Sequence, residues 1–371
     1  MKFTVSRDTL LNSIMVAQEV ITNKSPLSIL SNVLLTTAEN KVILKCTNST
    51  VHAITSFAAE IEEPGETTVF CDKFMSIISS LPMGDVEISN LNNEILVKSV
   101  SKKVKFKIKT LAADKFPIIK NFDSQNAIKI SAKTFKTMIR NTSFAVSNDP
   151  NRYFMTGCFL CNHENNLTMV ATDSRRMSVC NSIDFKHNVI DSIIPKKMLT
   201  VIDKYCQDEG EIEINTTAKQ FMVKSGSLEV TSSLIEGKYP AWQKVLPIGL
   251  DKTISVSKID LENAIKTAGI MATKEKRVNL QIDKGKMIVK TPETEIGNAT
   301  EEIAAEYDGI PVNIALNIQY LSDVLKVLDA ENVSIDFKTN QESKVTSALI
   351  VRDSKNSDNN SSIHIIMPMT N

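Results

Sequence analysis

The sequence predicts an α+β fold in which one unit, two helices packed on antiparallel strands, occurs three times along 371 residues. Three observations support this prediction. A strand-then-helix pattern recurs about 125 residues apart, and a second helical pattern recurs in the middle of each unit. The endings "KFP" at 115–117 and "KYP" at 238–240 recur at a similar interval. We expect them to close the last strand of the first two units, because Pro ends ladder pairing.

The first helix of each unit follows a short strand that ends in serine. The segments "FTVSRDTLLNSI", "IKISAKTFKTMI" and "ISVSKIDLENAI" align so that Ser6, Ser131 and Ser257 coincide. Serine is suited to the N-cap of a helix, and apolar residues then recur four positions apart. The pattern predicts that each unit opens with a strand followed by a helix.

A second helix is predicted in each unit by "DKFMSIISSL", "KKMLTVIDKY" and "IQYLSDVLKVL". Alternating runs such as "KVILKCTNS" and "KVKFKIKTL" surround these helices and are typical of strands. We place the three domains at 1–120, 127–248 and 250–371.

The overall charge is balanced, with 43 basic and 43 acidic residues. Global charge therefore predicts no polyanionic partner. No run of residues is long and apolar enough for a membrane helix, and the N-terminus lacks the apolar stretch of a signal peptide, so we expect a cytoplasmic protein without a membrane partner. The six cysteines stand singly in apolar runs, which is typical of buried free thiols.

The sequence offers little for catalysis. Its four histidines are scattered, and it contains none of the glycine-rich phosphate-binding motifs. Cys158, Cys161 and His163 could form half of a metal site, but "GCFLCNH" is more typical of a buried strand entering a loop. We expect no enzyme, no metal and no cofactor.

The segment "ATDSRRM" (171–177) is the densest polar motif in the chain. It could be a functional site, or it could be a strand-to-turn corner in which Asp173 organises backbone amides. The residues alone leave both readings open.

Basic residues gather on predicted helix faces. Lys133, Lys136 and Arg140 are spaced to share one face of a helix, and Lys197 and Lys204 repeat the arrangement. A solvated helix face is the simpler interpretation, but helices that contact DNA phosphates would have the same pattern.

Two further segments carry opposite charges: "KSVSKKVKFK" (98–107) holds five lysines and "ETEIGNATEEIAAE" (293–306) holds five glutamates. Each could be a charged sheet edge that discourages aggregation. Together they predict a head-to-tail contact between the first unit of one copy and the third unit of another.

Several motifs resemble a known family: "MKFTV", "NRYFMTG", "ATDSRRMSV", "GKYPAWQKVLP" and "IIMPM" are similar to segments of bacterial DNA polymerase III beta subunits, the replicative sliding clamps. The resemblance covers the whole chain. It implies three clamp domains per copy and a homodimeric ring that encircles double-stranded DNA. It also implies binding of the polymerase III catalytic subunit, the clamp loader, translesion polymerases, mismatch repair proteins and ligase through short peptide motifs.

The resemblance implies three sets of site residues. The partner pocket would comprise Met155, Thr172, Ser174, Arg175, Arg176, Met177, Pro240, Lys244, Val245, Leu246, Ile365, Met367, Pro368 and Met369. DNA contacts would come from Lys24, Arg152 and Phe154, together with Lys136, Arg140, Lys196 and Lys197 of the basic helix faces. The dimer interface would comprise Lys103, Lys105, Phe106, Ile270, Met271, Glu301 and Glu302.

The chain departs from the family pattern at two places on the pocket. Ser174-Arg175 stands where many members have Gly-His or Gly-Arg, and the tail ends "MPMTN" where many carry Arg-Leu. We therefore expect an unusual pocket rim and altered partner preference. The main alternative function is a monomeric repeat scaffold that binds only proteins, and an enzyme is a more distant one.

Overall fold

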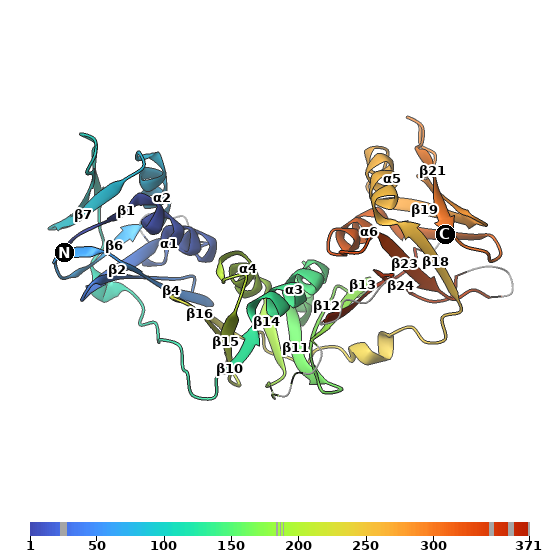
Figure 1. Cartoon of the computed structure of the whole chain (residues 1–371), viewed down its shortest axis with the longest axis horizontal. Coiled ribbons are helices and arrows are strands. Elements are labelled where there is room, and N and C mark those ends of the chain that lie inside the picture. Colours follow the sequence, from blue (N-terminus) through green and yellow to red (C-terminus); the bar gives the residue numbers. More distant parts are fainter. Residues whose placement is uncertain are drawn as a thin grey trace. The chain divides into compact units, whose positions relative to one another are not determined.

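The computed structural model describes residues 1–22, 28–182, 185, 187, 189–340, 345–354 and 360–369 (Figure 1). The chain forms two compact units. The first comprises residues 1–136 and 194–234, and the second comprises residues 137–193 and 235–371.

The first unit contains two antiparallel sheets. One has the order β5-β1-β7-β8-β9 and the other the order β10-β15-β16-β17-β4-β3-β2-β6. The strands of the first sheet are β1 (Lys2–Ser6), β5 (Glu60–Glu63), β7 (Asp85–Leu91), β8 (Glu94–Ser99) and β9 (Lys105–Lys109). Those of the second sheet are β2 (Asn32–Ala38), β3 (Lys41–Thr47), β4 (Val51–Ala58), β6 (Glu66–Phe70), β10 (Ile128–Ser131), β15 (Glu211–Thr216), β16 (Gln220–Ser225) and β17 (Leu228–Ser233).

The second unit contains one long sheet, which runs β11-β12-β13-β25-β24-β23-β18-β21-β20-β19-β22. Its strands are β11 (Gly157–His163), β12 (Asn166–Thr172), β13 (Arg176–Ser182), β18 (Lys252–Ser257), β19 (Arg277–Asp283), β20 (Lys286–Lys290), β21 (Thr300–Glu306), β22 (Val312–Asn317), β23 (Asn332–Phe337), β24 (Leu349–Asp353) and β25 (Asn360–Ile366). The division of the chain between the two units falls within β14 (Ser192–Pro195), after Ile193.

The helices confirm the predicted repeat. The first helix of each repeat is α1 (Arg7–Val20), α3 (Ala132–Thr142) or α5 (Lys258–Ile270), and the second is α2 (Cys71–Ser80), α4 (Lys196–Tyr205) or α6 (Ile318–Leu325). All three serines act as predicted: the hydroxyls of Ser6, Ser131 and Ser257 accept bonds from backbone amides three residues later. Each hydroxyl satisfies one of the free N–H groups that open a helix.

Strand pairing between repeats explains why three repeats fold as two units. Strand β17 of the second repeat pairs with β4 of the first, and β25 of the third pairs with β13 of the second. The second repeat therefore gives one half to each unit, because its two sheet halves continue into different neighbours.

The prediction for "KFP" and "KYP" was wrong in detail. Strand β9 ends at Lys109 and β17 at Ser233, so both motifs lie several residues beyond the strands they were expected to close. Their aromatic residues, Phe116 and Tyr239, are buried. The motifs therefore anchor the linkers through an apolar contact rather than through the ends of the strands.

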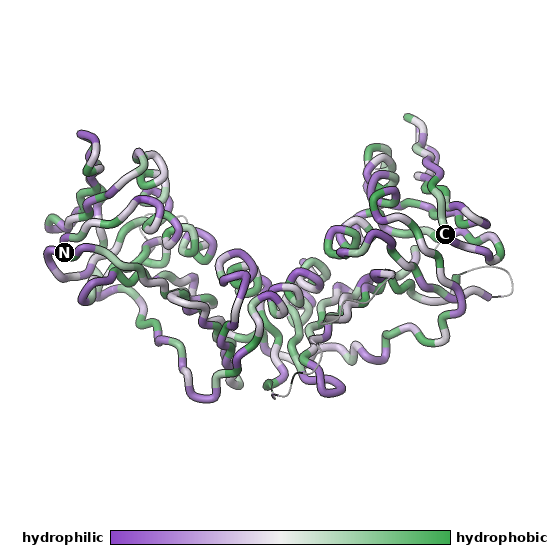
Figure 2. The backbone as a smooth tube through the Cα atoms, viewed as in Figure 1, coloured by the Kyte–Doolittle hydropathy of each residue, from purple (hydrophilic) through white to green (hydrophobic). Residues whose placement is uncertain are grey.

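Apolar and polar residues alternate along many strands, as Figure 2 shows. The inner residues form the cores, to which helices and strands both contribute buried side chains. All six cysteines are buried, and none of them forms a disulfide. Burial raises the pKa of the Cys180 thiol to about 12, so this side chain behaves as an apolar core residue.

Candidate functional site

A cavity of about 200 Å³ opens in the second unit, beside the turn that joins β12 to β13. Its wall combines this turn, the 3₁₀ segments Pro150–Met155 and Trp242–Val245, and the end of β25. The lining residues are Met155, Thr172, Ser174, Arg176, Met177, Pro240, Trp242, Val245, Ile365 and Met367. Segments from the second and third repeats thus meet in one mostly apolar hollow.

The turn Thr172–Arg176 forms the polar side of the cavity, and "ATDSRRM" has the predicted geometry of a strand-to-turn corner. The Asp173 carboxylate accepts bonds from the backbone amides of Arg175 and Arg176, which is the turn-forming role. Ser174 has a φ of 76°, and its amide donates to the Thr172 hydroxyl. The turn therefore carries cavity-lining side chains on a backbone that its own polar groups hold.

The same turn occurs in the first repeat. Ser49 has a φ of 78°, and its amide donates to the hydroxyl of Thr47. The first two repeats therefore share this turn geometry, and their side chains differ.

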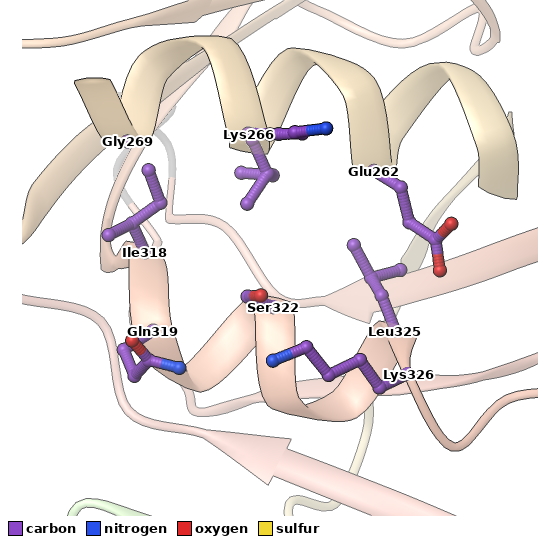
Figure 3. A pocket seen from close by; sticks show the side chains of 9 residues that line it. Glu262, Lys266, Gly269, Ile318, Gln319, Ser322, Leu325 and Lys326 are labelled. Carbon is purple, nitrogen blue, oxygen red and sulfur yellow. The ribbon is translucent and has the colours of Figure 1, made fainter. Parts of the chain in front are cut away.

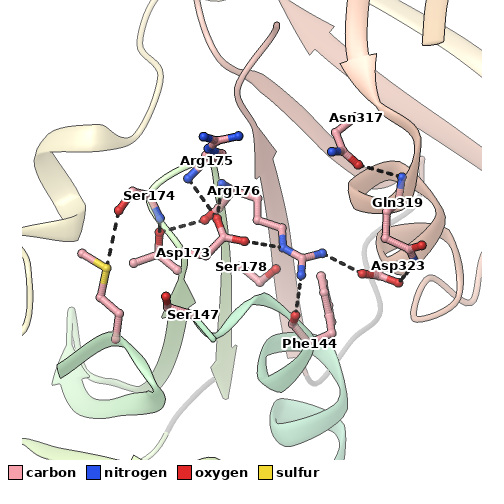
Figure 4. A network of polar contacts seen from close by, with 12 residues as sticks. Phe144, Ser147, Asp173, Ser174, Arg175, Arg176, Ser178, Asn317, Gln319 and Asp323 are labelled. Carbon is pink, nitrogen blue, oxygen red and sulfur yellow. Dashed lines mark hydrogen bonds and ion pairs between the residues drawn. The ribbon is translucent and has the colours of Figure 1, made fainter. Parts of the chain in front are cut away.

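Arg176 is the most heavily bonded side chain of the turn (Figure 4). Its Nε donates to Asp173 at 3.0 Å, its Nη1 to Asp323 at 2.7 Å and its Nη2 to the carbonyl of Phe144 at 2.8 Å. Its guanidinium carbon also lies 4.5 Å from the ring centre of Tyr320, a distance at which cation–π attraction is substantial. Sequence spacing alone could not show this network, because Asp323 and Tyr320 belong to the next repeat.

Aromatic residues support the apolar floor. Tyr239 stacks on Phe159 with ring centres 4.9 Å apart, and burial raises the pKa of the Tyr239 phenol. Trp242 is buried and packs edge-on against His163. Trp242 was not among the residues predicted to line the pocket. It is the only tryptophan of the chain and stands inside the quoted motif "GKYPAWQKVLP", which was the available signal.

The rim is polar and contains one residue that was predicted to meet DNA. The Arg152 Nη1 donates to the Ser174 hydroxyl, which donates in turn to the Met155 sulfur at 3.5 Å. The Arg152 side chain remains 49% exposed. Ser174 thus links the rim to Arg152.

Five predicted pocket residues do not line the cavity: Arg175, Lys244, Leu246, Pro368 and Met369. Leu246 packs against the neighbouring apolar cluster, while Arg175 and Lys244 are exposed. The Met369 amide donates to the carbonyl of Ala315, which ties the tail to β22. The remaining nine predicted residues line the cavity, so side-chain direction within each segment decides which residues reach it.

The predicted DNA-contacting residues lie in different environments. Arg140 and Lys196 are exposed, Phe154 is half-buried, and Lys24 lies outside the described residues. The Lys197 Nζ lies 2.9 Å from Glu19, which also binds Lys204.

The prediction that Lys136 faces DNA is wrong. Lys136 is only 3% exposed, and its Nζ donates to the carbonyl of Cys206 and to Asp208. Helical spacing placed Lys136 on the basic face, but the long side chain reaches a carbonyl seventy residues away instead of the solvent.

A second cavity, of about 400 Å³, lies between α5 and α6 (Figure 3). Ile265, Ile318 and Leu325 contribute apolar surface, while Lys266 and Lys326 supply positive charge. Gly269 lacks a side chain that could fill the gap. We call this cavity the α5–α6 groove.

Neither a metal site nor a membrane span emerges from the described residues. Within the described parts of the chain, no three histidine, cysteine or acidic side chains are grouped to hold a metal ion. The described helices include none that is both long and apolar enough to cross a membrane.

Comparisons with known proteins match the whole chain. Models of the DNA polymerase III beta subunit match as the N-terminal domain over residues 1–120, the central domain over 129–241 and the C-terminal domain over 243–370. The beta sliding clamp of Treponema pallidum is 31% identical over 376 residues, covering 100% of this chain and 99% of the relative. That of Pseudomonas aeruginosa is 30% identical, with 100% of both chains covered.

Solved structures agree with the sequence comparisons. The Pseudomonas aeruginosa sliding clamp bound to griselimycin superposes with a TM-score of 0.89 at 28% identity, covering 100% of both chains. The Bacillus subtilis sliding clamp superposes with a TM-score of 0.89 at 25% identity, covering 100% of this chain and 99% of that one.

Proposed function

This chain belongs to the DNA polymerase III beta subunit family, and we propose that two copies close into a ring around duplex DNA and bind partner proteins in the cavity beside Trp242. It is a DNA sliding clamp, a non-catalytic processivity factor of replication. A closed ring keeps a tethered polymerase at high effective concentration on its template, so sliding replaces dissociation.

Ring closure is supported above all by the way in which the repeats join within one chain. At each junction the last strand of one repeat pairs antiparallel with the fourth strand of the preceding repeat: β17 with β4, and β25 with β13. The last strand of the first repeat, β9, ends its sheet with one edge unpaired among the described residues. The fourth strand of the third repeat, β21, bonds β18 only through Ala305 and Glu306, so most of one edge is open there as well.

The two internal junctions also share one register. In each repeat, a series of paired residues starts three residues before the capping serine, Ser6, Ser131 or Ser257, and runs from strand to strand across the sheet. On the last strand of each repeat, the three series reach Phe106, Val230 and His364. Val230 pairs with Ala53, and His364 with Ser178. The equivalent residue on β21 is Ala299, which precedes Thr300 as Ala53 precedes Ile54. Repeating the junction between copies therefore sets Phe106 opposite Ala299.

This register brings opposite charges together. With Phe106 opposite Ala299, Lys105 faces Thr300 and Lys103 faces Glu302 of the second copy. Lys103, Lys105 and Glu302 are all exposed in the single chain. Opposite charges across a strand pair favour the register, and the same charges discourage pairing with a wrong edge.

The helices support the same junction. Counted from the capping serines, Glu19, Phe144 and Ile270 are equivalent. Glu19 binds two lysines of α4, and Phe144 packs on Arg176 and the core of the third repeat. Ile270 is 81% exposed. We propose that Ile270, with Met271 and Glu301, contacts the first repeat of the second copy.

DNA would pass through the ring with weak, non-specific contacts. A zero net charge with local basic residues suits sliding, because few phosphate contacts are made at once. The proposed contacts are Lys24, Arg140, Arg152, Phe154, Lys196 and Lys197. Lys136 is omitted because it is buried.

The cavity would receive short peptides with apolar anchors. Met155, Met177 and Met367 give it an adaptable surface, which suits one pocket that serves several partners. The proposed partners are the polymerase III catalytic subunit, the clamp loader, translesion polymerases, mismatch repair proteins and ligase, all acting in the cytoplasm.

A DNA-retention assay tests the ring. The chain is loaded by a clamp loader onto nicked circular DNA and onto the same DNA after linearisation, and protein that stays bound is measured by gel filtration. A ring remains on the circle and slides off the linear ends. Equal retention on both, or a molecular mass near 41.1 kDa in solution, would instead support a monomeric scaffold.

A further inference from the structure

We propose that Asp323, a residue of α6 outside the cavity, is a positioning residue for the partner pocket. Through its ion pair with Arg176, it holds the turn Thr172–Arg176 in the shape that receives a peptide. The inference rests on the proposed partner-binding role of the cavity.

The ion pair joins two repeats inside the second unit. Arg176 opens β13 in the second repeat, and Asp323 lies in α6 of the third repeat. Their side chains are 11% and 19% exposed, and the Nη1–Oδ2 distance is 2.7 Å. Solvent screens an ion pair at this depth only partly. Its removal therefore costs more free energy than the removal of a surface ion pair.

The backbone of Arg176 is part of the hydrogen-bonded turn that forms one wall of the cavity. The Arg176 carbonyl accepts a bond from the Thr172 hydroxyl, and its amide donates to Asp173. Without Asp323, the guanidinium retains Asp173 and the Phe144 carbonyl but loses its ion pair with α6, where only the contact with the Tyr320 ring remains. Any turn of the guanidinium toward Asp173 then moves the lining atoms of Arg176.

Asp323 is itself held in place by α6. The Gln319 Nε2 donates to the Asp323 Oδ1 at 2.8 Å, while the other oxygen binds Arg176 (Figure 4). Lys326 lies 3.8 Å from Asp323. Gln319 and Lys326 also line the α5–α6 groove, so the support of the pocket wall extends to that groove.

The test measures peptide affinity in the full chain. A fluorescein-labelled synthetic peptide with a Gln-x-x-Leu-Phe motif is titrated against the original chain and Asp323→Asn, a change of equal size that removes the charge. We expect binding to weaken by about five- to twentyfold, equal to ~1–2 kcal/mol. Equal affinity for the two proteins would overturn the inference.

Asp336→Asn is the matched control. Asp336 lies in the same unit, its side chain is 11% exposed, and its Oδ2 is 2.8 Å from the Nε of Arg352. It does not line the cavity. We expect its loss to leave peptide affinity unchanged, whereas an equal loss in both variants would show general destabilisation and reject the positioning role.

A rescue separates positioning from folding. Gln319→Glu combined with Asp323→Asn returns a negative charge one helical turn away, and we expect it to recover part of the affinity. Should Asp323→Asn fail to fold, Gln319→Ala replaces it, since this change frees the carboxylate and otherwise removes only a 3.5 Å contact with Lys276, and a smaller loss of affinity is expected. No loss with Gln319→Ala would then reject the inference.

A second measurement requires no peptide. Trp242, the only tryptophan, lines the same cavity as Arg176. We expect acrylamide to quench its fluorescence more strongly in Asp323→Asn than in Asp336→Asn, and equal quenching would count against the inference. If the original chain binds no peptide, the proposed partner role fails, while quenching still decides whether Asp323 shapes the cavity.

Discussion

His364 of β25 and Ser178 of β13 lie directly opposite each other where the second and third repeats join, with the imidazole Nδ1 3.1 Å from the hydroxyl oxygen. Both residues are buried. In the other internal junction, the equivalent pair of opposite residues is Val230 and Ala53. One polar pair therefore lies in the strand contact that also builds the proposed partner pocket.

Burial of His364 predicts a loss of stability in mild acid. Desolvation lowers its pKa to about 3 in the folded chain, against 6.5 for an exposed histidine. Below pH 6.5 the unfolded chain binds a proton that the folded chain excludes, so the free energy of unfolding falls as the pH falls. The expected loss is about 1 kcal/mol per pH unit near pH 6 and approaches ~1.3 kcal/mol per pH unit near pH 5.

Urea unfolding at several pH values measures this effect. His364→Gln keeps a polar side chain opposite Ser178 but does not titrate, so its stability should depend less steeply on pH in that range. Identical pH slopes for the two proteins would mean that His364 is not the responsible group.

The repeated register predicts a specific cross-link between copies. Lys103→Cys together with Glu302→Cys should form a disulfide across the proposed β9–β21 contact, because opposite residues of a strand pair have Cβ atoms about 4.5–5.5 Å apart. The native cysteines are buried and should not compete. Non-reducing electrophoresis of the oxidised protein would show a covalent dimer.

Lys107→Cys with Glu302→Cys is the matched control. It uses the same two strands, but the junction register sets its cysteines four residues apart, about 13 Å along the strand. If this control cross-links as well as the first pair, the strands meet in another register or in none.

We expect substitutions of Arg152 and Lys136 to affect DNA binding differently. Replacing Arg152 by Ala is expected to lower the slope of log affinity against log salt by about 0.9 if one phosphate contact is lost. Lys136→Ala should leave this slope unchanged and reduce thermal stability, because the buried Cys206 carbonyl loses its donor. Salt titrations by fluorescence anisotropy, with thermal unfolding of each variant, would reveal the reverse pattern if the assignments are exchanged.

Deleting the tail from Met367 onward should abolish peptide binding while the dimer persists. Met367 lines the cavity, and its amide donates to the carbonyl of Arg175, so the deletion removes one wall and a bond to the turn. A short peptide gains most of its affinity from a few buried apolar anchors, so the loss should exceed tenfold. Peptide titration and sedimentation decide the outcome, with deletion of residues 370–371 alone as the control.

If the dimer and peptide binding disappear together, the tail is structural. The proposed dimer contact uses β9 and β21, which lie apart from the tail in the sheet order.

Local sequence patterns predicted the repeat, the helices and the segments that line the cavity. Ser6, Ser131 and Ser257 cap their helices as predicted, because a cap depends on residues only three positions apart. The motifs around Thr172, Pro240 and Ile365 were also found from the sequence, since each is a short run of residues. Interactions between residues a few positions apart can be predicted from the sequence.

Long-range contacts determine which charged side chains are buried or paired. Lys136 has the spacing of a basic face, yet Cys206 and Asp208 draw it into the interior. Arg176 belongs to a polar motif with two possible meanings, and only folding brings Asp323 of the next repeat to its guanidinium. Such pairings depend on how sheets from different repeats join, and side-chain length and direction then decide which charge is buried, which is paired and which lines the cavity.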